Sequence, residues 1–167
     1  MFNRTRRKTI NKIIEDNLDY LVRFAYFRLS DRPEAEDLVY EAILRFLEKD
    51  NSAIKPESVR LYLFRTVHNL CLDRARSRGK EPIPIEAIDI EDNDGENVLD
   101  LEEAARINAC LASLPPREAD IIRMNVIDGL SFVDISSILS IPQSTAKSRY
   151  KSGMDKLRKL FANNQSS

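Results

Sequence analysis

Residues 131–151 read SFVDISSILSIPQSTAKSRYK, and this stretch predicts the fold of the C-terminal part of the chain. Ser131 is a good helix N-cap, with Asp134 three residues after it. Leu139-Ser-Ile-Pro142 is typical of a tight turn, and a long helix is expected from Gln143 to about Phe161. Apolar residues recur at helical spacing around the turn: Ile135, Ile138 and Leu139 before it, Ile141 within it, and Ala146, Tyr150, Met154, Leu157 and Phe161 after it. The stretch therefore predicts a helix-turn-helix.

The second of these helices is expected to present a polar face over its N-terminal half. The outward residues are Gln143, Ser144, Lys147, Ser148 and Lys151. In helix-turn-helix proteins this half of the second helix enters the major groove of DNA. Lysine can contact guanine acceptors or phosphates, glutamine can pair with adenine, and serine can donate or accept. The face therefore predicts DNA binding; the alternative is the ordinary solvated side of an amphipathic helix.

Three further helices are expected in the first half of the chain. The first covers residues 9–29, and the second runs from an N-cap at Asp31 to about Lys49, with Pro33 in its first turn. After a polar loop, Pro56 starts a third helix that reaches about Ser77. The predicted buried face of the second helix contains Leu38, Ala42, Ile43, Phe46 and Leu47. One outer face of the third helix carries Tyr62, Arg65, Thr66, Asn69, Asp73 and Arg76.

An acidic segment separates these helices from the C-terminal ones. Residues 80–97 contain Pro82 and Pro84 and are typical of a flexible linker. The net charge is +5 over residues 1–80, −9 over 81–112 and +3 over 113–167, although the whole chain carries only −1. Helices are expected to resume over 98–114 and 117–128. The predicted fold class is all-α, with a helical domain at 1–79, an acidic linker at 80–97 and a helix-turn-helix domain at 98–167.

Composition limits the other classes of protein. The 167 residues include only 4 glycines and are 43% hydrophobic, which favours a helical protein with packed cores. Cys71 and Cys110 lack the CxxC or Cys/His arrangement that would suggest zinc, no disulfide framework is implied, and no cofactor is predicted. No apolar run is long enough to span a membrane, and no signal peptide is visible. We therefore expect a cytoplasmic protein with no membrane insertion of its own.

Several segments resemble the extracytoplasmic-function (ECF) group of bacterial RNA polymerase sigma factors. In their region 2, the polymerase-docking helix is similar to PEAEDLVYEA at 33–42, and the promoter-melting helix is similar to YLFRTVHNLCLDRAR at 62–76. Their region 4 is similar to LPPRE at 114–118, GLSFVDI at 129–135 and IPQSTAKSR at 141–149. The resemblance covers roughly residues 15–78 and 98–160 in the same order. It implies two helical domains that act in transcription initiation.

The resemblance also implies roles for individual residues. Core RNA polymerase would be bound by Asp37, Leu38, Tyr40 and Glu41. The promoter −10 element would be read and melted by Tyr62, Arg65, Asn69, Asp73 and Arg76, and a loop at 51–57 would capture a flipped base. The −35 element would be read by Gln143, Ser144, Thr145, Lys147, Ser148, Arg149 and Lys151. Three positions depart from the family pattern: Tyr40 replaces a glutamine, Ser140 a turn glycine and Ser152 a basic residue.

The function implied by the resemblance is that of a sigma factor and not of an enzyme. Its partners would be core RNA polymerase, promoter DNA and an anti-sigma factor. The same helix-turn-helix would also suit a free-standing transcriptional regulator, which, unlike a sigma factor, should bind duplex promoter DNA alone. A nuclease is disfavoured, because the sequence has no carboxylates clustered with His or Lys, no glycine-rich phosphate loop and no metal-ligand spacing.

Overall fold

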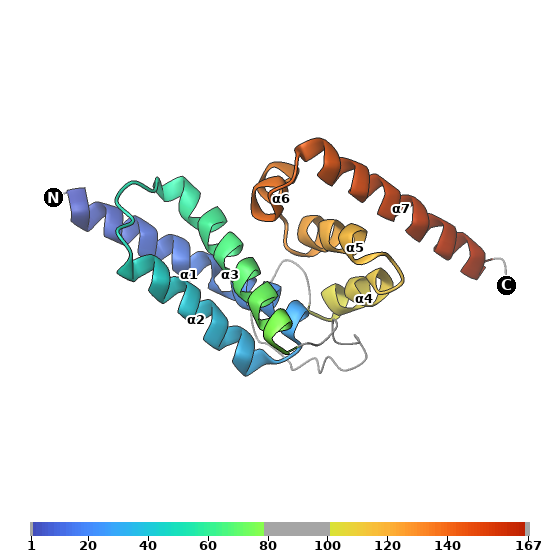
Figure 1. The fold of residues 1–167 in the computed structure, drawn as a ribbon, viewed down its shortest axis with the longest axis horizontal. Helices are drawn as coiled ribbons and strands as arrows, with labels where there is room; N and C mark the ends of the chain where they lie inside the picture. Colours follow the sequence, from blue (N-terminus) through green and yellow to red (C-terminus); the bar gives the residue numbers. More distant parts are fainter. Residues whose placement is uncertain (1, 79–100, 166–167) are drawn as a thin grey trace. The chain divides into compact units, whose positions relative to one another are not determined.

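The computed structural model describes residues 2–78 and 101–165, and within these ranges the chain is built from helices without strands (Figure 1). The chain divides into two compact units, Met1–Ile83 and Pro84–Ser167. The prediction of an all-α fold with two helical domains is therefore confirmed. The predicted linker at 80–97, and with it the exact ends of the two predicted domains, lies outside the described residues.

The N-terminal unit is a bundle of three mutually packed helices, α1 (Phe2–Leu29), α2 (Arg32–Glu48) and α3 (Pro56–Arg78). Its largest core side chains are fully buried: Leu21, Phe24, Leu38, Phe46, Leu63 and Phe64. The rings of Phe24 and Phe64 meet edge to face at 5.4 Å, a favoured aromatic geometry. Burial of each such side chain stabilises the fold by about 1.5–3 kcal/mol, so this apolar core holds the three helices together.

Helix α1 begins at Phe2, whereas the sequence predicted a start at residue 9. The apolar periodicity starts only at Ile10, so a pattern of buried residues could not show the turns before it. Arginine and lysine are good helix formers, and they dominate this early segment. In addition, the side chain of Arg6 is held by hydrogen bonds to the loop between α2 and α3.

The predicted N-cap of α2 is confirmed, because the carboxylate of Asp31 accepts a hydrogen bond of 3.1 Å from the amide of Glu34. The predicted buried face of α2 is wrong at Leu47, whose side chain is 49% exposed. Phe46 is buried, and the next residue in an α-helix points about 100° away. The apolar character of Leu47 alone therefore misplaced it in the core.

The C-terminal unit contains α4 (Leu101–Leu111), α5 (Pro116–Ile122), the π-helical turn η2 (Arg123–Ile127), α6 (Phe132–Leu139) and α7 (Gln143–Gln165). The N-cap of α6 is confirmed, since the hydroxyl of Ser131 accepts from the amide of Asp134 at 3.1 Å. Helices α6 and α7 pack together as the predicted helix-turn-helix. A second core forms where α7 residues pack on α4 and α5: Leu111, Leu114, Ala119, Ile122, Tyr150, Met154 and Leu157.

The predicted single helix over 117–128 is wrong in one respect, because the backbone widens into η2 after α5. The amide of Asp128 donates to the carbonyl of Arg123, five residues earlier, at 3.1 Å. The Arg123 side chain donates to Asn108 Oδ1 at 2.7 Å and to Asp120 Oδ1 at 2.6 Å. Asn108 is almost fully buried, so a tertiary contact with α4 accompanies a widening that local residue patterns did not indicate.

Two positions of α7 differ from its predicted inner stripe. Phe161 is 53% exposed, because the core on which α7 packs ends at Leu157. Gly153, which the stripe did not include, is buried. A Cβ at Gly153 would lie 2.6 Å from Ile122 Cδ1 and 3.3 Å from Glu118 Cβ. The absence of a side chain at this position therefore allows the close approach of α5 and α7.

Candidate nucleic-acid interface

The turn between α6 and α7 sets the direction of the predicted recognition helix. Ser140 adopts the left-handed backbone expected of a turn glycine, with φ 56° and ψ 46°. The amide of Ile141 donates to the carbonyl of Ser136 at 3.0 Å, which closes the end of α6. The amides of Thr145 and Ala146 both donate to the carbonyl of Pro142 at 3.1 Å, which starts α7. A serine therefore performs this turn despite the strain of its positive φ.

The first turns of α7 present the polar face that the sequence predicted. The exposed side chains are Gln143, Ser144, Lys147, Ser148 and Lys151. The other two predicted contacts, Thr145 and Arg149, are half-buried, and Ala146 is fully buried on the opposite side. The face combines two cations with serine hydroxyls and an amide, which is a composition suited to phosphate and base contacts.

Contacts with α5 and α6 hold this helix from behind. The rings of Phe132 and Tyr150 meet edge to face at 5.3 Å. The hydroxyl of Ser152 donates to Glu118 Oε1 at 2.7 Å, and Lys156 Nζ lies 2.9 Å from both oxygens of the same carboxylate. The hydrogen bonds from Lys156 and Ser152 hold the pKa of Glu118 below its usual value. Ser152, which departs from the family's basic residue, thus fastens α7 to α5.

The predicted −10 face lies on α3. Arg65, Asn69, Asp73 and Arg76 are exposed along this helix, as their helical spacing predicted. Tyr62 is only half-exposed, because its ring lies 5.5 Å from the ring of Phe46 in the core. Part of the Tyr62 ring is therefore used in packing, and the surface that remains for stacking on a base is smaller than the sequence suggested.

The loop that joins α2 to α3 has defined internal contacts. Asn51 Nδ2 donates to the carbonyl of Phe46 at 3.0 Å, and the amide of Ile54 donates to the carbonyl of Asn51 at 3.0 Å. The hydroxyl and amide of Ser52 donate to Asp50 Oδ1 at 2.6 and 3.1 Å, and these two bonds lower the pKa of the Asp50 carboxyl. The side chains of Ser52, Ala53 and Lys55 in this loop are exposed, so a ligand can reach them.

The predicted polymerase-docking face lies on α2 and needs one correction. Asp37 is exposed, Tyr40 is 53% exposed and Glu41 is half-exposed. Leu38 is 0% exposed and belongs to the core, so it cannot touch a partner directly. Sequence reasoning missed Leu44, which is 56% exposed and lies one helical turn after Tyr40. The exposed residues Asp37, Tyr40, Glu41, Leu44 and Leu47 are called the α2 face below.

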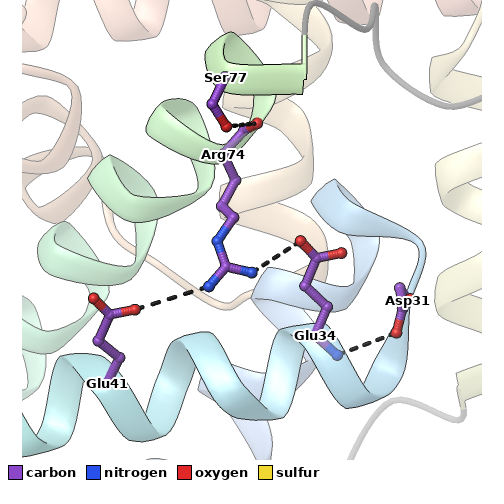
Figure 2. A network of polar contacts seen from close by, with 5 residues as sticks. All are labelled: Asp31, Glu34, Glu41, Arg74 and Ser77. Atoms are coloured by element: carbon purple, nitrogen blue, oxygen red, sulfur yellow. Dashed lines mark hydrogen bonds and ion pairs between the residues drawn. The ribbon is translucent and has the colours of Figure 1, made fainter.

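Arg74 of α3 joins the two helices that carry these faces (Figure 2). Its Nη1 donates to Glu34 Oε1 at 2.9 Å, and its Nη2 lies 3.9 Å from Glu41 Oε2. The Glu34 side chain is only 9% exposed, and its backbone amide is the one capped by Asp31. No local pattern predicted this network, because Arg74 and Glu34 are 40 residues apart in the chain.

The remaining groups that could carry chemistry are few in the part of the chain that the structure describes. No group of three or more His, Cys, Asp or Glu residues there could hold a metal ion. Both cysteines are free; Cys71 is buried, which raises the pKa of its thiol to about 11, and Cys110 is exposed. Among the described helices, none is long and apolar enough to cross a membrane.

A helix-turn-helix with an exposed polar recognition face, on a chain with a second helical unit, defines a two-domain DNA-binding protein. Comparison with protein-family models gives the particular family. Residues 13–81 match sigma-70 region 2, and residues 110–159 match sigma-70 region 4. The two matches occur in the order of a sigma factor and together cover most of the chain. The chain belongs to the sigma-70 family, in its ECF group.

Individual relatives agree with this assignment. The ECF RNA polymerase sigma factor SigE of Mycolicibacterium smegmatis is 29% identical over 162 residues, and the match covers 93% of this chain and 63% of that protein. The ECF sigma factor SigW of Bacillus subtilis is 28% identical, with 88% and 86% covered. A similar fold, with a TM-score of 0.62 and 23% identity, occurs in the sigma factor RpoE of Bartonella quintana, solved in complex with the anti-sigma factor NepR. That match covers 89% of this chain and 95% of RpoE.

Proposed function

We propose that this protein is a sigma factor that binds core RNA polymerase, recognises the −35 and −10 elements of a promoter and promotes DNA opening. The observation that carries the proposal is the presence of both sigma-70 regions in order, each with an exposed face of suitable chemistry. The chain spans only 63% of the length of the SigE relative, so the proposed activity rests on these two faces and not on the activity of that relative.

Each proposed role rests on a different face. Residues 1–79 would dock on core polymerase through the α2 face and hold the melted −10 strand on α3. Residues 98–167 would read the −35 element with α7, and residues 80–97 would connect the two. Arg65 and Arg76 are exposed cations that can follow a DNA backbone, and Lys147 and Lys151 provide the same charge on α7.

The remaining parts of the proposal follow from this role. A factor that positions polymerase on the chromosome acts in the cytoplasm, requires no cofactor and carries out no covalent chemistry of its own. An anti-sigma factor is a further proposed partner. The RpoE structure was determined with such a protein, and the α2 face of this chain combines acidic and apolar side chains that a protein partner could cover.

A reconstituted holoenzyme tests the proposal with one variant for each domain. Asp37→Arg should weaken binding to core polymerase, because it reverses an exposed charge at the proposed docking face. Asp19→Arg, which reverses an exposed charge on α1, is the matched control. Lys147→Ala should reduce transcription from a cognate promoter without loss of core binding, whereas Lys159→Ala, near the far end of α7, should not.

Three outcomes would refute the assignment. If Asp37→Arg bound core polymerase as well as Asp19→Arg, the α2 face would not be the docking site. Loss of core binding by Lys147→Ala would show that the polar face of α7 contributes to core binding, and the assignment of this face to DNA alone would be wrong. Tight, specific binding of the protein alone to duplex promoter DNA, which a free-standing regulator would show, would contradict an activity that depends on core polymerase.

A further inference from the structure

The N-terminal end of α1 lies at the same end of the N-terminal unit as the loop between α2 and α3 (Figure 1). Arg6 makes the contact. Its Nη1 donates to Asn51 Oδ1 at 3.0 Å, and its Nη2 donates to the backbone carbonyls of Asn51 and Ile54, at 2.7 Å for Ile54. One guanidinium therefore bridges the two residues that open and close the turn, across 45 to 48 residues of sequence.

We propose that Arg6 is a positioning residue for base recognition: it fixes the shape of the 51–54 turn, and through that shape it sets the base preference of the promoter −10 element. The inference rests on the proposed function, in which this loop receives an unpaired base. It concerns a residue outside all of the predicted DNA-contact sets, in a part of α1 that the sequence did not predict to be helical.

The geometry of the contact supports a role in positioning. A guanidinium is planar and presents several donors in a fixed arrangement, so three acceptors held by one arginine cannot move independently. Asn51 is held at the same time from the other side, through its Nδ2 bond to the Phe46 carbonyl. The turn is thus anchored to both α1 and α2, while Ser52 and Ala53 between the anchors remain exposed.

A loop that selects one base needs such support. Selection depends on donors and acceptors that are held in place before the base arrives, because a mobile loop can adjust to several bases. A good base-specific contact discriminates between bases by about 1–3 kcal/mol, which is roughly 5- to 150-fold in affinity. Loss of the Arg6 bridge should therefore reduce discrimination between bases more than it reduces affinity for DNA in general.

Three variants of the full-length chain distinguish the effect of Arg6 on the shape of the 51–54 turn from the effect of its positive charge on DNA binding. Arg6→Gln removes the charge and the bridge, and Arg6→Lys keeps the charge but not the planar fork. Arg7→Gln removes the same charge from an exposed neighbour and is the matched control. Each is assembled with core polymerase and titrated with pre-melted promoter DNA, in which every unpaired −10 position carries each of the four bases in turn. The promoter is one mapped with the wild-type holoenzyme.

We expect Arg6→Gln to reduce the ratio of affinities between the best and worst base at one −10 position by about fivefold or more. Arg6→Lys should show a large part of that loss, while Arg7→Gln should weaken all four DNAs by a similar factor. If Arg6→Gln also weakened all four equally, Arg6 would contribute charge only, and the inference would be wrong.

A second measurement needs neither polymerase nor DNA. Hydrogen exchange in the free protein should accelerate at the Ile54 amide, which donates within the turn, in Arg6→Gln but not in Arg7→Gln. Unchanged exchange would overturn the inference while leaving the proposed function intact. Conversely, a wild-type chain that fails to bind core polymerase would overturn the proposed function, whatever the exchange experiment shows about the turn.

Discussion

Removal of the Arg74 guanidinium should destabilise the N-terminal unit. Most of the effect should come from the lost bond to Glu34, and little from the lost contact with Glu41. Arg74→Met keeps most of the aliphatic length and removes the charge. The bond to Glu34 is 2.9 Å long and ends on a carboxylate that is only 9% exposed. Hydrogen bonds to charged groups contribute about 1.5–3 kcal/mol, and water replaces such a bond poorly at a carboxylate that is mostly buried. We expect a loss of about 2 kcal/mol in the free energy of unfolding.

The contact with Glu41 should contribute much less. Its atoms are 3.9 Å apart, and the side chains of Arg74 and Glu41 are 35% and 41% exposed. Exposed ion pairs of this kind contribute about 0.2–1 kcal/mol, because water screens the charges and the long side chains lose freedom. Glu41 also pairs with Arg45 at 2.7 Å, so it keeps one partner without Arg74. Two double-mutant cycles, Arg74→Met with Glu34→Gln and Arg74→Met with Glu41→Gln, measure the two coupling energies directly.

Native-state hydrogen exchange is the appropriate assay because it reports each unit separately. Peptides from α2 and α3 should exchange about 30-fold faster in Arg74→Met, the factor that corresponds to about 2 kcal/mol, and peptides from α7 serve as the internal control. The Glu34 cycle should give a coupling well above that of the Glu41 cycle. Equal couplings, or equal acceleration in α7, would show that the buried bond does not hold α2 against α3.

Three further predictions concern single groups. The pKa of Glu118 is lowered, so its contacts stabilise the fold at pH values above the usual glutamate pKa of 4.5, and this stabilisation is lost as the pH falls. The difference in the free energy of unfolding between wild type and Glu118→Gln should therefore become smaller when unfolding is measured from pH 7 down to pH 3. Thiol titration of the native protein should modify Cys110 rapidly and Cys71 only on unfolding, since Cys71 is buried and its pKa is raised to about 11. Gly153→Val should lower the urea midpoint, with a loss of about 1–3 kcal/mol, because an added Cβ would lie 2.6 Å from a buried isoleucine methyl group. The first prediction would be contradicted if the stability difference between wild type and Glu118→Gln stayed the same at all pH values. The second would be contradicted if both thiols of the native protein reacted rapidly, and the third if Gly153→Val left the urea midpoint unchanged.

Local signals in the sequence were sufficient for the elements that end in caps and turns. Asp31 and Ser131 each accept from the amide three residues later, as their residue types predict. Ser140 takes the left-handed conformation that its turn requires. These interactions span a few residues, so the residues that determine them are neighbours in the sequence and can be recognised there.

The errors have a common origin in interactions between distant residues. Leu38 and Leu47 are both apolar residues of α2, yet one is fully buried and the other half-exposed, because the bundle covers only one side of the helix. The Arg74–Glu34 bond and the Arg6 contacts join residues 40 or more positions apart. A charged residue that forms such a bond looks like any other surface residue in the sequence, and only the packed helices show its partner.

Two of the long-range polar contacts in the N-terminal unit, those of Arg6 and Arg74, have complementary positions. Arg6 fastens α1 to the loop where α2 ends and α3 begins, whereas Arg74 fastens the C-terminal part of α3 to the first turn of α2. Because α2 and α3 pack antiparallel, the first turn of α2 and the C-terminal part of α3 lie at the end of the pair that is opposite their shared loop, so these contacts hold the pair at both ends (Figure 1). The α2 face and the predicted −10 face on α3 are thereby held relative to each other. Substitution of Arg74, which joins α3 to α2, should consequently disturb the proposed polymerase docking and the proposed −10 recognition together, while substitutions of exposed residues such as Asp37 or Asn69 should disturb only one.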